Sequence, residues 1–147
     1  MDIIFKPENI VDDIYKIKIK DIDKIDQESL QEELQSKRIQ ELLKTGSLRC
    51  ELFSKSTYEN MRPLRDIIRF QTIYITNTCA TILEIKDDYI IIKASTSFKQ
   101  LMMIMFTDDN MSIYAHIRAI SICGKDKIEI FKLVTFDIIY DKEINNE

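Results

Sequence analysis

The sequence predicts a mainly β fold, a small six-stranded antiparallel β-barrel preceded by an N-terminal α/β extension. Short apolar segments follow one another at regular spacing from Gln71 onward. Two pairs of these segments flank turn-forming residues, at Asp87-Asp88 and at Gly124-Lys125-Asp126. Regular short strands separated by turns are typical of small barrels, and closure protects apolar edges from aggregation. We expect an extension at residues 1–55 and a barrel domain at residues 56–147.

Composition places the chain among soluble globular proteins. Its 147 residues suit one domain, or a small domain with an extension, and 45% are hydrophobic while 31% are charged. The net charge of −4 argues against non-specific nucleic-acid binding. No apolar run approaches the roughly 20 residues of a membrane-spanning helix, and the N-terminus does not resemble a signal peptide. We therefore expect a cytoplasmic protein with no membrane insertion.

Few residues suit catalysis or metal binding. The three cysteines, Cys50, Cys79 and Cys123, are far apart in the chain, which disfavours a disulfide framework or a zinc site. His116 is the single histidine, and its alternating surroundings favour a strand residue over a ligand. Only two glycines occur, without the spacing of a Rossmann or P-loop site. We expect no enzyme, no metal site and no cofactor.

The first third of the chain predicts a strand, a helix and a second strand. Residues 2–5 suit a short strand that ends before Pro7. Residues 14–22 alternate isoleucine with lysine, which predicts a half-buried or edge strand. Residues 27–44 predict one helix that begins after Asp26, or with a capping box from Ser29 to Glu32, and ends at Thr45-Gly46. A Glu33–Lys37 pair would support it. Residues 48–53 alternate again, as in a strand.

The apolar side chains of the predicted helix do not form one stripe. Leu30 and Leu34 share one side, whereas Ile39 and Leu43 fall nearly opposite at 100° per residue. Such a helix either contacts two surfaces, for instance its own domain and a partner, or packs loosely on the surface.

The remaining elements are expected to be mostly strands. Residues 58–69 suit a short helix or an irregular loop. Strands are expected at residues 72–76, then in a hairpin at 80–86 and 89–94, and in a second hairpin at 112–123 and 127–136. Residues 101–106 fit a helical face through Met102 and Met105 or a buried strand, and the surrounding strands favour the strand. The segment after Phe136 extends the last strand or forms a short helix.

An arginine cluster precedes the predicted barrel and is the one pattern that suggests a ligand. Arg62, Arg65 and Arg69 lie close together in the stretch MRPLRDIIRF. A guanidinium group binds phosphate through two nitrogens and stacks on flat bases, so these residues suit a nucleotide. A solvated helix face, with Asp66 neutralising one arginine, is the alternative interpretation.

The order of these features resembles the PilZ domain, the bacterial cyclic di-GMP receptor module. The segment Arg65-Asp66-Ile67-Ile68-Arg69 matches its R-x-x-x-R motif, directly ahead of a six-stranded antiparallel barrel. The resemblance implies that Arg65 and Arg69 contact the phosphates of cyclic di-GMP and stack on guanine, and that Arg62 assists them.

The second PilZ motif is altered in this chain, which points to a degenerate member. The family has an acidic residue or asparagine, then serine and glycine, where this chain reads Glu84-Ile85-Lys86-Asp87-Asp88-Tyr89. We therefore expect a non-enzymatic cyclic di-GMP effector, or an adaptor that acts through a protein partner. The alternative, suggested by many Ile, Lys, Asp and Asn residues, is a structural or assembly protein of a phage or virus.

Overall fold

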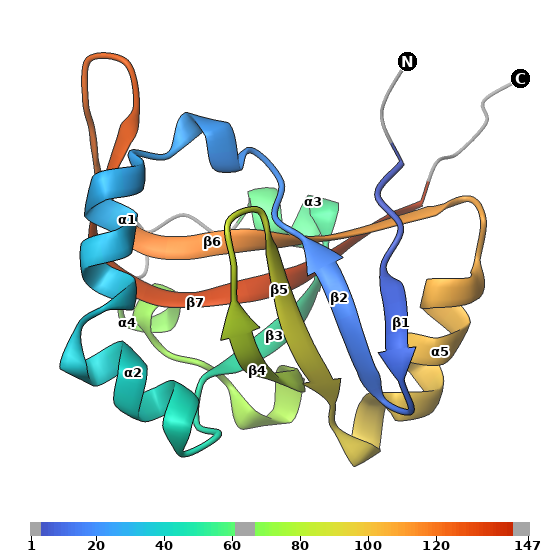
Figure 1. Ribbon diagram of the computed structural model, residues 1–147. Coiled ribbons are helices and arrows are strands. Elements are labelled where there is room, and N and C mark those ends of the chain that lie inside the picture. Colours follow the sequence, from blue (N-terminus) through green and yellow to red (C-terminus); the bar gives the residue numbers. More distant parts are fainter. Residues whose placement is uncertain (1–3, 61–66, 143–147) are drawn as a thin grey trace, which may run out of the picture.

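The computed structural model describes residues 4–60 and 67–142, and seven strands form one mixed sheet (Figure 1). The strand order is β1-β2-β5-β4-β3-β7-β6. The strands are β1 (Glu8–Val11), β2 (Ile14–Lys18), β3 (Arg49–Ser54), β4 (Thr78–Ile85), β5 (Tyr89–Ala94), β6 (Met111–Cys123) and β7 (Ile128–Lys142). The helices are η1 (Ile22–Lys24), α1 (Gln27–Leu34), α2 (Lys37–Lys44), α3 (Lys55–Glu59), α4 (Ile67–Gln71), η2 (Ile75–Asn77), η3 (Thr96–Phe98) and α5 (Lys99–Thr107).

The sheet is not the predicted six-stranded antiparallel barrel. It has seven strands, it is not closed, and β3 runs parallel to β7, with Leu52 opposite Ile138. The cause is a change of partner within β3, because Arg49–Glu51 pair with β4 whereas Leu52–Ser54 pair with β7. Isolated bridges, such as Ile19 to Ala115, join the chain after β2 to the long hairpin without a continuous ladder.

The main core lies between β6–β7 and the shorter strands, which β6 and β7 cross in Figure 1. Fully buried side chains come from β2, β4 and β5 on one side and from β7 on the other: Ile17, Ile82, Ile90, Ile92, Leu133, Phe136 and Ile138. Burial of this apolar surface is the main favourable contribution to folding.

Residues 27–44 form two helices instead of the single predicted helix. The chain breaks at Gln35-Ser36, where the Ser36 hydroxyl accepts a hydrogen bond from the Ile39 N–H and starts α2. The break turns Ile39 toward the same core as Leu30 and Leu34. This explains why these residues would lie on opposite sides of one continuous helix. The predicted cap at Asp26 is confirmed, since its carboxylate accepts from the Ser29 N–H.

The end of this helical region is also confirmed. Gly46 has a φ of 67°, the left-handed conformation that favours glycine. The expected Glu33–Lys37 pair does not form; Glu33 instead pairs with Arg38.

The two predicted hairpins are confirmed as β4–β5 and β6–β7. The strand predicted at residues 101–106 is wrong, because these residues form α5. In this helix Met102 and Met105 share the buried face at a helical spacing, while Ile104 is 68% exposed. The strand predicted at 72–76 is wrong too, since this segment runs into η2. The strand predicted within residues 14–22 is β2, but it lies between β1 and β5 and is not an edge.

Strands from both sides of the expected boundary after residue 55 belong to one sheet. β2 pairs with β5, and β3 pairs with β4 and β7. Residues before this boundary therefore complete the main core. Of the described helices, none is long and apolar enough to cross a membrane.

Candidate functional site

Of the predicted ligand-binding arginines, Arg69 lies on a segment that packs against the outer face of β3, β7 and β6. We call residues 55–60 and 67–77 the strap. Arg62 and Arg65 lie outside the described residues, whereas Arg69 lies in α4 of the strap. The outer face is the one opposite the main core, and it carries Phe53, Tyr114 and Ile139.

Three charged side chains are buried on this outer face. Glu51, Arg118 and Asp137 are each 0% exposed. Arg118 Nε and Nη2 donate to the two carboxylate oxygens of Asp137 at 2.8 and 2.7 Å, and Nη2 also donates to Glu51 Oε2 at 2.8 Å. Arg118 Nη1 donates to the carbonyl oxygens of Phe70 and Thr72, both at 3.2 Å. Every N–H of this guanidinium therefore has an acceptor, and two of the acceptors belong to the strap.

Arg69 joins the same cluster from the strap. Its Nη2 and Nη1 donate to the two carboxylate oxygens of Glu51 at 2.8 and 3.1 Å, a bidentate pair. Its guanidinium carbon lies 3.6 Å from the centre of the Tyr74 ring, and its Nη1 also donates to the Thr72 carbonyl at 2.8 Å. The side chain of Arg69 is 18% exposed.

The position of Glu51 follows from an irregularity in β3. The register of β3 against β4 shifts between Cys50 and Glu51, where the strand begins to leave β4 for β7. The backbone N–H of Glu51 is thereby free to donate to Asp137 Oδ1 at 3.2 Å. Asn77 also holds the Glu51 side chain in place, because its amide donates to Glu51 Oε1 at 3.2 Å and to the Leu52 carbonyl at 3.0 Å.

Burial and pairing shift the pKa values of the cluster in different directions. Burial alone would raise the pKa of Glu51, but hydrogen bonds from Arg69 and Arg118 hold it below its ordinary value. Burial raises the pKa of Asp137 to about 6, against the opposing effect of Arg118. Burial would lower the pKa of Arg118, but Asp137 and Glu51 raise it above its ordinary value. The two arginines thus balance two carboxylates in a site closed to solvent.

Next to this cluster, His116 and Tyr58 border a small apolar cavity. His116 Nδ1 lies 3.3 Å from the Tyr58 hydroxyl, and burial lowers the pKa of this histidine. The cavity has a volume of about 240 Å³ and is lined by Ile25, Tyr58, Phe70, His116, Ile117, Ala119, Ser121, Ile128 and Ile130. A cavity of this size holds one or two side chains.

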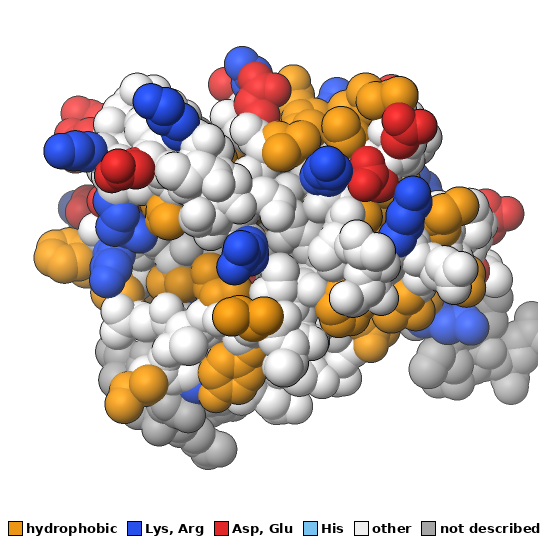
Figure 2. Space-filling view, turned by 90° about the horizontal axis from the view of Figure 1, so that it is seen from below, with side chains coloured by type: hydrophobic (Ala, Val, Ile, Leu, Met, Phe, Trp, Pro, Cys, Tyr) orange, Lys and Arg blue, Asp and Glu red, His pale blue; other side chains and the backbone are white. Residues whose placement is uncertain are grey.

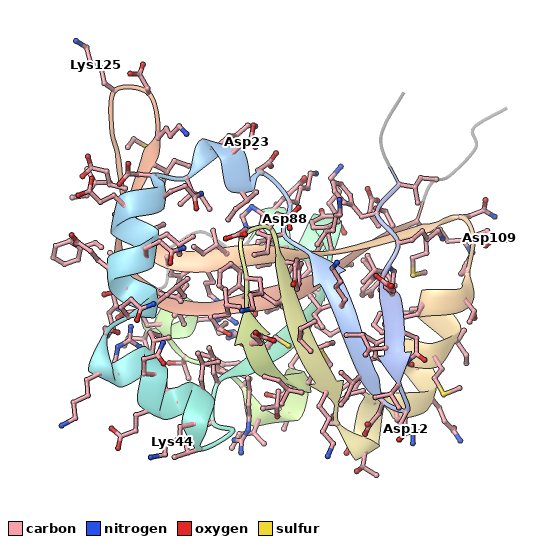
Figure 3. The ribbon with its side chains drawn as sticks, in the orientation of Figure 1. Asp12, Asp23, Lys44, Asp88, Asp109 and Lys125 are labelled. Carbon is pink, nitrogen blue, oxygen red and sulfur yellow. The ribbon has the colours of Figure 1, made fainter. Side chains whose placement is uncertain are left out.

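The altered turn at Asp87-Asp88 lines a different cleft. The Asp88 carbonyl accepts from the Ile19 N–H at 2.8 Å, and the turn lies near Asp23 in Figure 3. Lys18, Lys20 and Lys55 share this cleft of about 570 Å³ with several aspartates. Within residues 4–60 and 67–142, no group of His, Cys, Asp and Glu is arranged to hold a metal ion.

Sequence reasoning missed the buried charges. Glu51, Arg118 and Asp137 each stand between two apolar neighbours, a pattern that is also typical of the solvated face of a strand. The signal that could have identified them is their placement between apolar residues together with their complementary signs. Comparison of the chain with protein-family models, curated proteins and solved structures gave no match.

Proposed function

We propose that this chain is a non-enzymatic adaptor module that acts through protein contacts, and that Arg69 has become part of the scaffold. The observation that carries this proposal is the environment of Arg69. Its bidentate edge binds the Glu51 carboxylate and its flat face stacks on Tyr74.

These are the two contacts through which an arginine would bind a nucleotide. The Glu51 carboxylate occupies the place of a phosphate, and the Tyr74 ring occupies the place of a base. A cyclic di-GMP molecule that used Arg69 would have to displace Glu51, which is fully buried and would lose its bidentate partner. Weakening the pairing of a buried charge is costly, so the exchange is unfavourable.

The strap also presents apolar side chains to the outside. Ile68 and Ile75 are both 77% exposed, and Tyr74 is 46% exposed. Seen from below, the surface carries several groups of hydrophobic side chains among lysines and acidic residues (Figure 2). Exposed aliphatic residues on a segment that ion pairs fix in place are suited to a protein partner.

Titration calorimetry with cyclic di-GMP separates the adaptor from the nucleotide receptor. We expect no binding heat with the wild-type chain, and we expect Arg69→Ala to lower the melting temperature because Glu51 loses its bidentate partner. Arg49→Ala, at an exposed arginine on the same strand as Glu51, is the matched control and should leave stability unchanged. Stoichiometric nucleotide binding that Arg69→Ala abolishes and Arg49→Ala retains would instead establish the receptor.

The adaptor itself is tested by quantitative affinity capture. A partner should be enriched with the wild-type bait, lost with Ile75→Lys, and retained with Leu83→Lys, which alters an exposed leucine on β4. If both variants capture the same proteins as the wild type, the strap is not the binding surface.

A further inference from the structure

The hairpin formed by the distal parts of β6 and β7 has two very different edges. We call residues 119–133 the arm; its turn carries Lys125, which projects away from the rest of the molecule in Figure 3. Helix α1 and the residue before it cover the β7 edge of the arm. The Asp26 N–H donates to the Ile128 carbonyl at 2.8 Å, the Ile130 N–H donates to Ser29 Oγ at 2.9 Å, and the Leu133 N–H donates to Glu33 Oε2 at 2.8 Å.

The register of the arm shows which groups of β6 point to its other edge. Opposite residues in an antiparallel pair either bond to each other or both direct their backbone groups outward. Ile128, Ile130 and Leu133 point outward, toward α1, and their partners on β6 are Cys123, Ser121 and Ala119. The backbone groups of these three β6 residues therefore point away from β7.

The first half of the β6 edge is occupied in the same alternating pattern. The Ile113 N–H donates to the Phe5 carbonyl, the Ala115 carbonyl accepts from the Lys20 N–H, and the Ile117 carbonyl accepts from the Tyr58 hydroxyl. Among residues 4–60 and 67–142, no hydrogen bond reaches the outward backbone groups of Ala119, Ser121 or Cys123. The free edge therefore begins where the covered edge ends.

The free edge lies beside the 240 Å³ cavity, which includes both Ala119 and Ser121 in its lining. Ile25, Tyr58 and Phe70 also line this cavity. Because Ile128 and Ile130 of β7 line it too, the cavity lies on the face of the arm next to the free edge.

The sequence of this edge lacks the features that normally prevent a strand edge from pairing with another strand. Ala119-Ile120-Ser121-Ile122-Cys123 has no charge and no proline, and Ile122 is 57% exposed. The opposite edge of the sheet, β1, has the charged Glu8 and an irregular register between Asn9 and Val11. Charges and bulges of that kind normally prevent edge-to-edge association.

We propose that the free edge of β6 pairs with the same edge of a second copy of this chain, antiparallel and centred on Ser121. In this register Ile122 faces Ile120 of the second copy, and Ala119 faces its Cys123. Each isoleucine meets an isoleucine and each small residue meets a small one, with no like charges opposed across the two-fold axis. Both copies supply the same free N–H and carbonyl groups, so one continuous sheet would cross the dimer.

The first test is disulfide trapping. Ser121→Cys is made in a Cys123→Ser background, which removes the exposed native thiol. At the axis the two Cα atoms would be about 5.5 Å apart, within the usual range for a disulfide. We expect a covalent dimer under mild oxidation. Glu129→Cys in the same background, on the β7 strand of the arm, is the control and should remain monomeric on a reducing-agent-free gel.

The second test uses charge and sedimentation. Ile122→Lys should raise the dimer dissociation constant about tenfold or more, since each lysine would face Ile120 of the second copy and the two lysines would be diagonal neighbours across the axis. Phe131→Lys, at a 71% exposed residue on the β7 side of the arm, should leave it unchanged. Circular dichroism checks that both variants are folded.

Three results would overturn the proposal. They are a monomer at every concentration with no selective crosslinking, a dimer that Phe131→Lys but not Ile122→Lys disrupts, and crosslinking of Glu129→Cys as fast as Ser121→Cys. The dimer tests are independent of the capture experiment, because they alter residues of the arm and not the exposed residues of the strap. Failure to capture a partner through the strap would therefore not change their outcome.

Discussion

The two faces of β7 bury very different chemistry at neighbouring residues. Phe136 and Ile138 point into the main core, where nearly every side chain is apolar. Asp137, between them, points to the outer face and joins Arg118, Glu51 and Arg69. Apolar contacts are non-directional, whereas bidentate ion pairs demand a fixed geometry. The inner face therefore drives collapse of the sheet, and the outer face determines where the strap lies.

The largest expected effect comes from removing the central charge of the outer face. Arg118→Met should lower the free energy of unfolding by about 3–5 kcal/mol at pH 7, because Glu51 and Asp137 would remain buried without their shared partner. Urea denaturation of the purified protein measures this change.

A double-mutant cycle separates this effect from ordinary loss of packing. The double variant Arg118→Met/Asp137→Asn should lose less free energy of unfolding than the two single variants lose together, because the buried negative charge is removed together with its partner. Ile138→Ala, on the inner face, should cost about 2–5 kcal/mol and should add to Arg118→Met without coupling. Additive behaviour of Arg118→Met with Asp137→Asn would contradict the proposed dependence of one on the other.

A smaller effect is expected from pH. The pKa of Asp137 is raised from 3.8 to about 6 in the folded protein, so the folded state binds more protons than the unfolded state between these values. Stability should therefore fall as pH rises through this window, by about 3 kcal/mol in total at 1.36 kcal/mol per pKa unit. Urea unfolding at pH 5 and pH 7 samples the upper part of this window, where the fall should be about 1.3 kcal/mol.

Asp137→Asn is the control for the pH effect. It removes the titrating group and should flatten the slope between pH 5 and pH 7, while leaving any slope due to other groups. Glu51 has the opposite effect on stability, because its pKa is lowered in the folded protein. Its contribution to stability is present at neutral pH and is lost as the pH falls below the ordinary range of a carboxyl group. An unchanged slope in Asp137→Asn would show that another group titrates in this window.

The smallest expected effect comes from the edge of the outer cluster. Asn77→Ala removes hydrogen bonds to Glu51 and to the Leu52 carbonyl, and should cost about 1–2 kcal/mol. Asn60→Ala removes only an exposed bond to the Ser56 carbonyl and should change stability by less than about 0.5 kcal/mol. Equal melting temperatures for the two variants would mean that Asn77 does not hold the strap.

Local signals in the sequence predicted the local structure well. The Asp87-Asp88 and Gly124-Lys125-Asp126 turns, the cap at Asp26 and the glycine at residue 46 were all found, because each depends on a few adjacent residues. The break at Ser36 was visible too, as a stripe out of phase, although we interpreted it as one helix with two contact surfaces or with loose packing.

Non-local features could not be predicted in this way. A six-residue apolar run such as 101–106 suits a helix or a strand, and its place beside the end of the sheet decides between them. The parallel contact of β3 with β7 depends on a change of partner that no short pattern encodes. The charge cluster is hidden for the same reason, since Glu51 is interpreted as a surface residue until Arg118 and Asp137 are placed beside it.

The parallel pairing of β3 with β7 also determines when the protein can fold during its synthesis. β3 leaves the ribosome early, but half of its ladder and two of the partners of Glu51, Arg118 and Asp137, belong to β6 and β7. A nascent chain that stops before β6 would therefore carry an unpaired half-strand, and its Glu51 would lack the Arg118 partner. Contacts of such long sequence separation slow folding, because the loop between them must close first. A chain that contains β6 and β7, rather than an N-terminal fragment without them, is consequently the unit that folds.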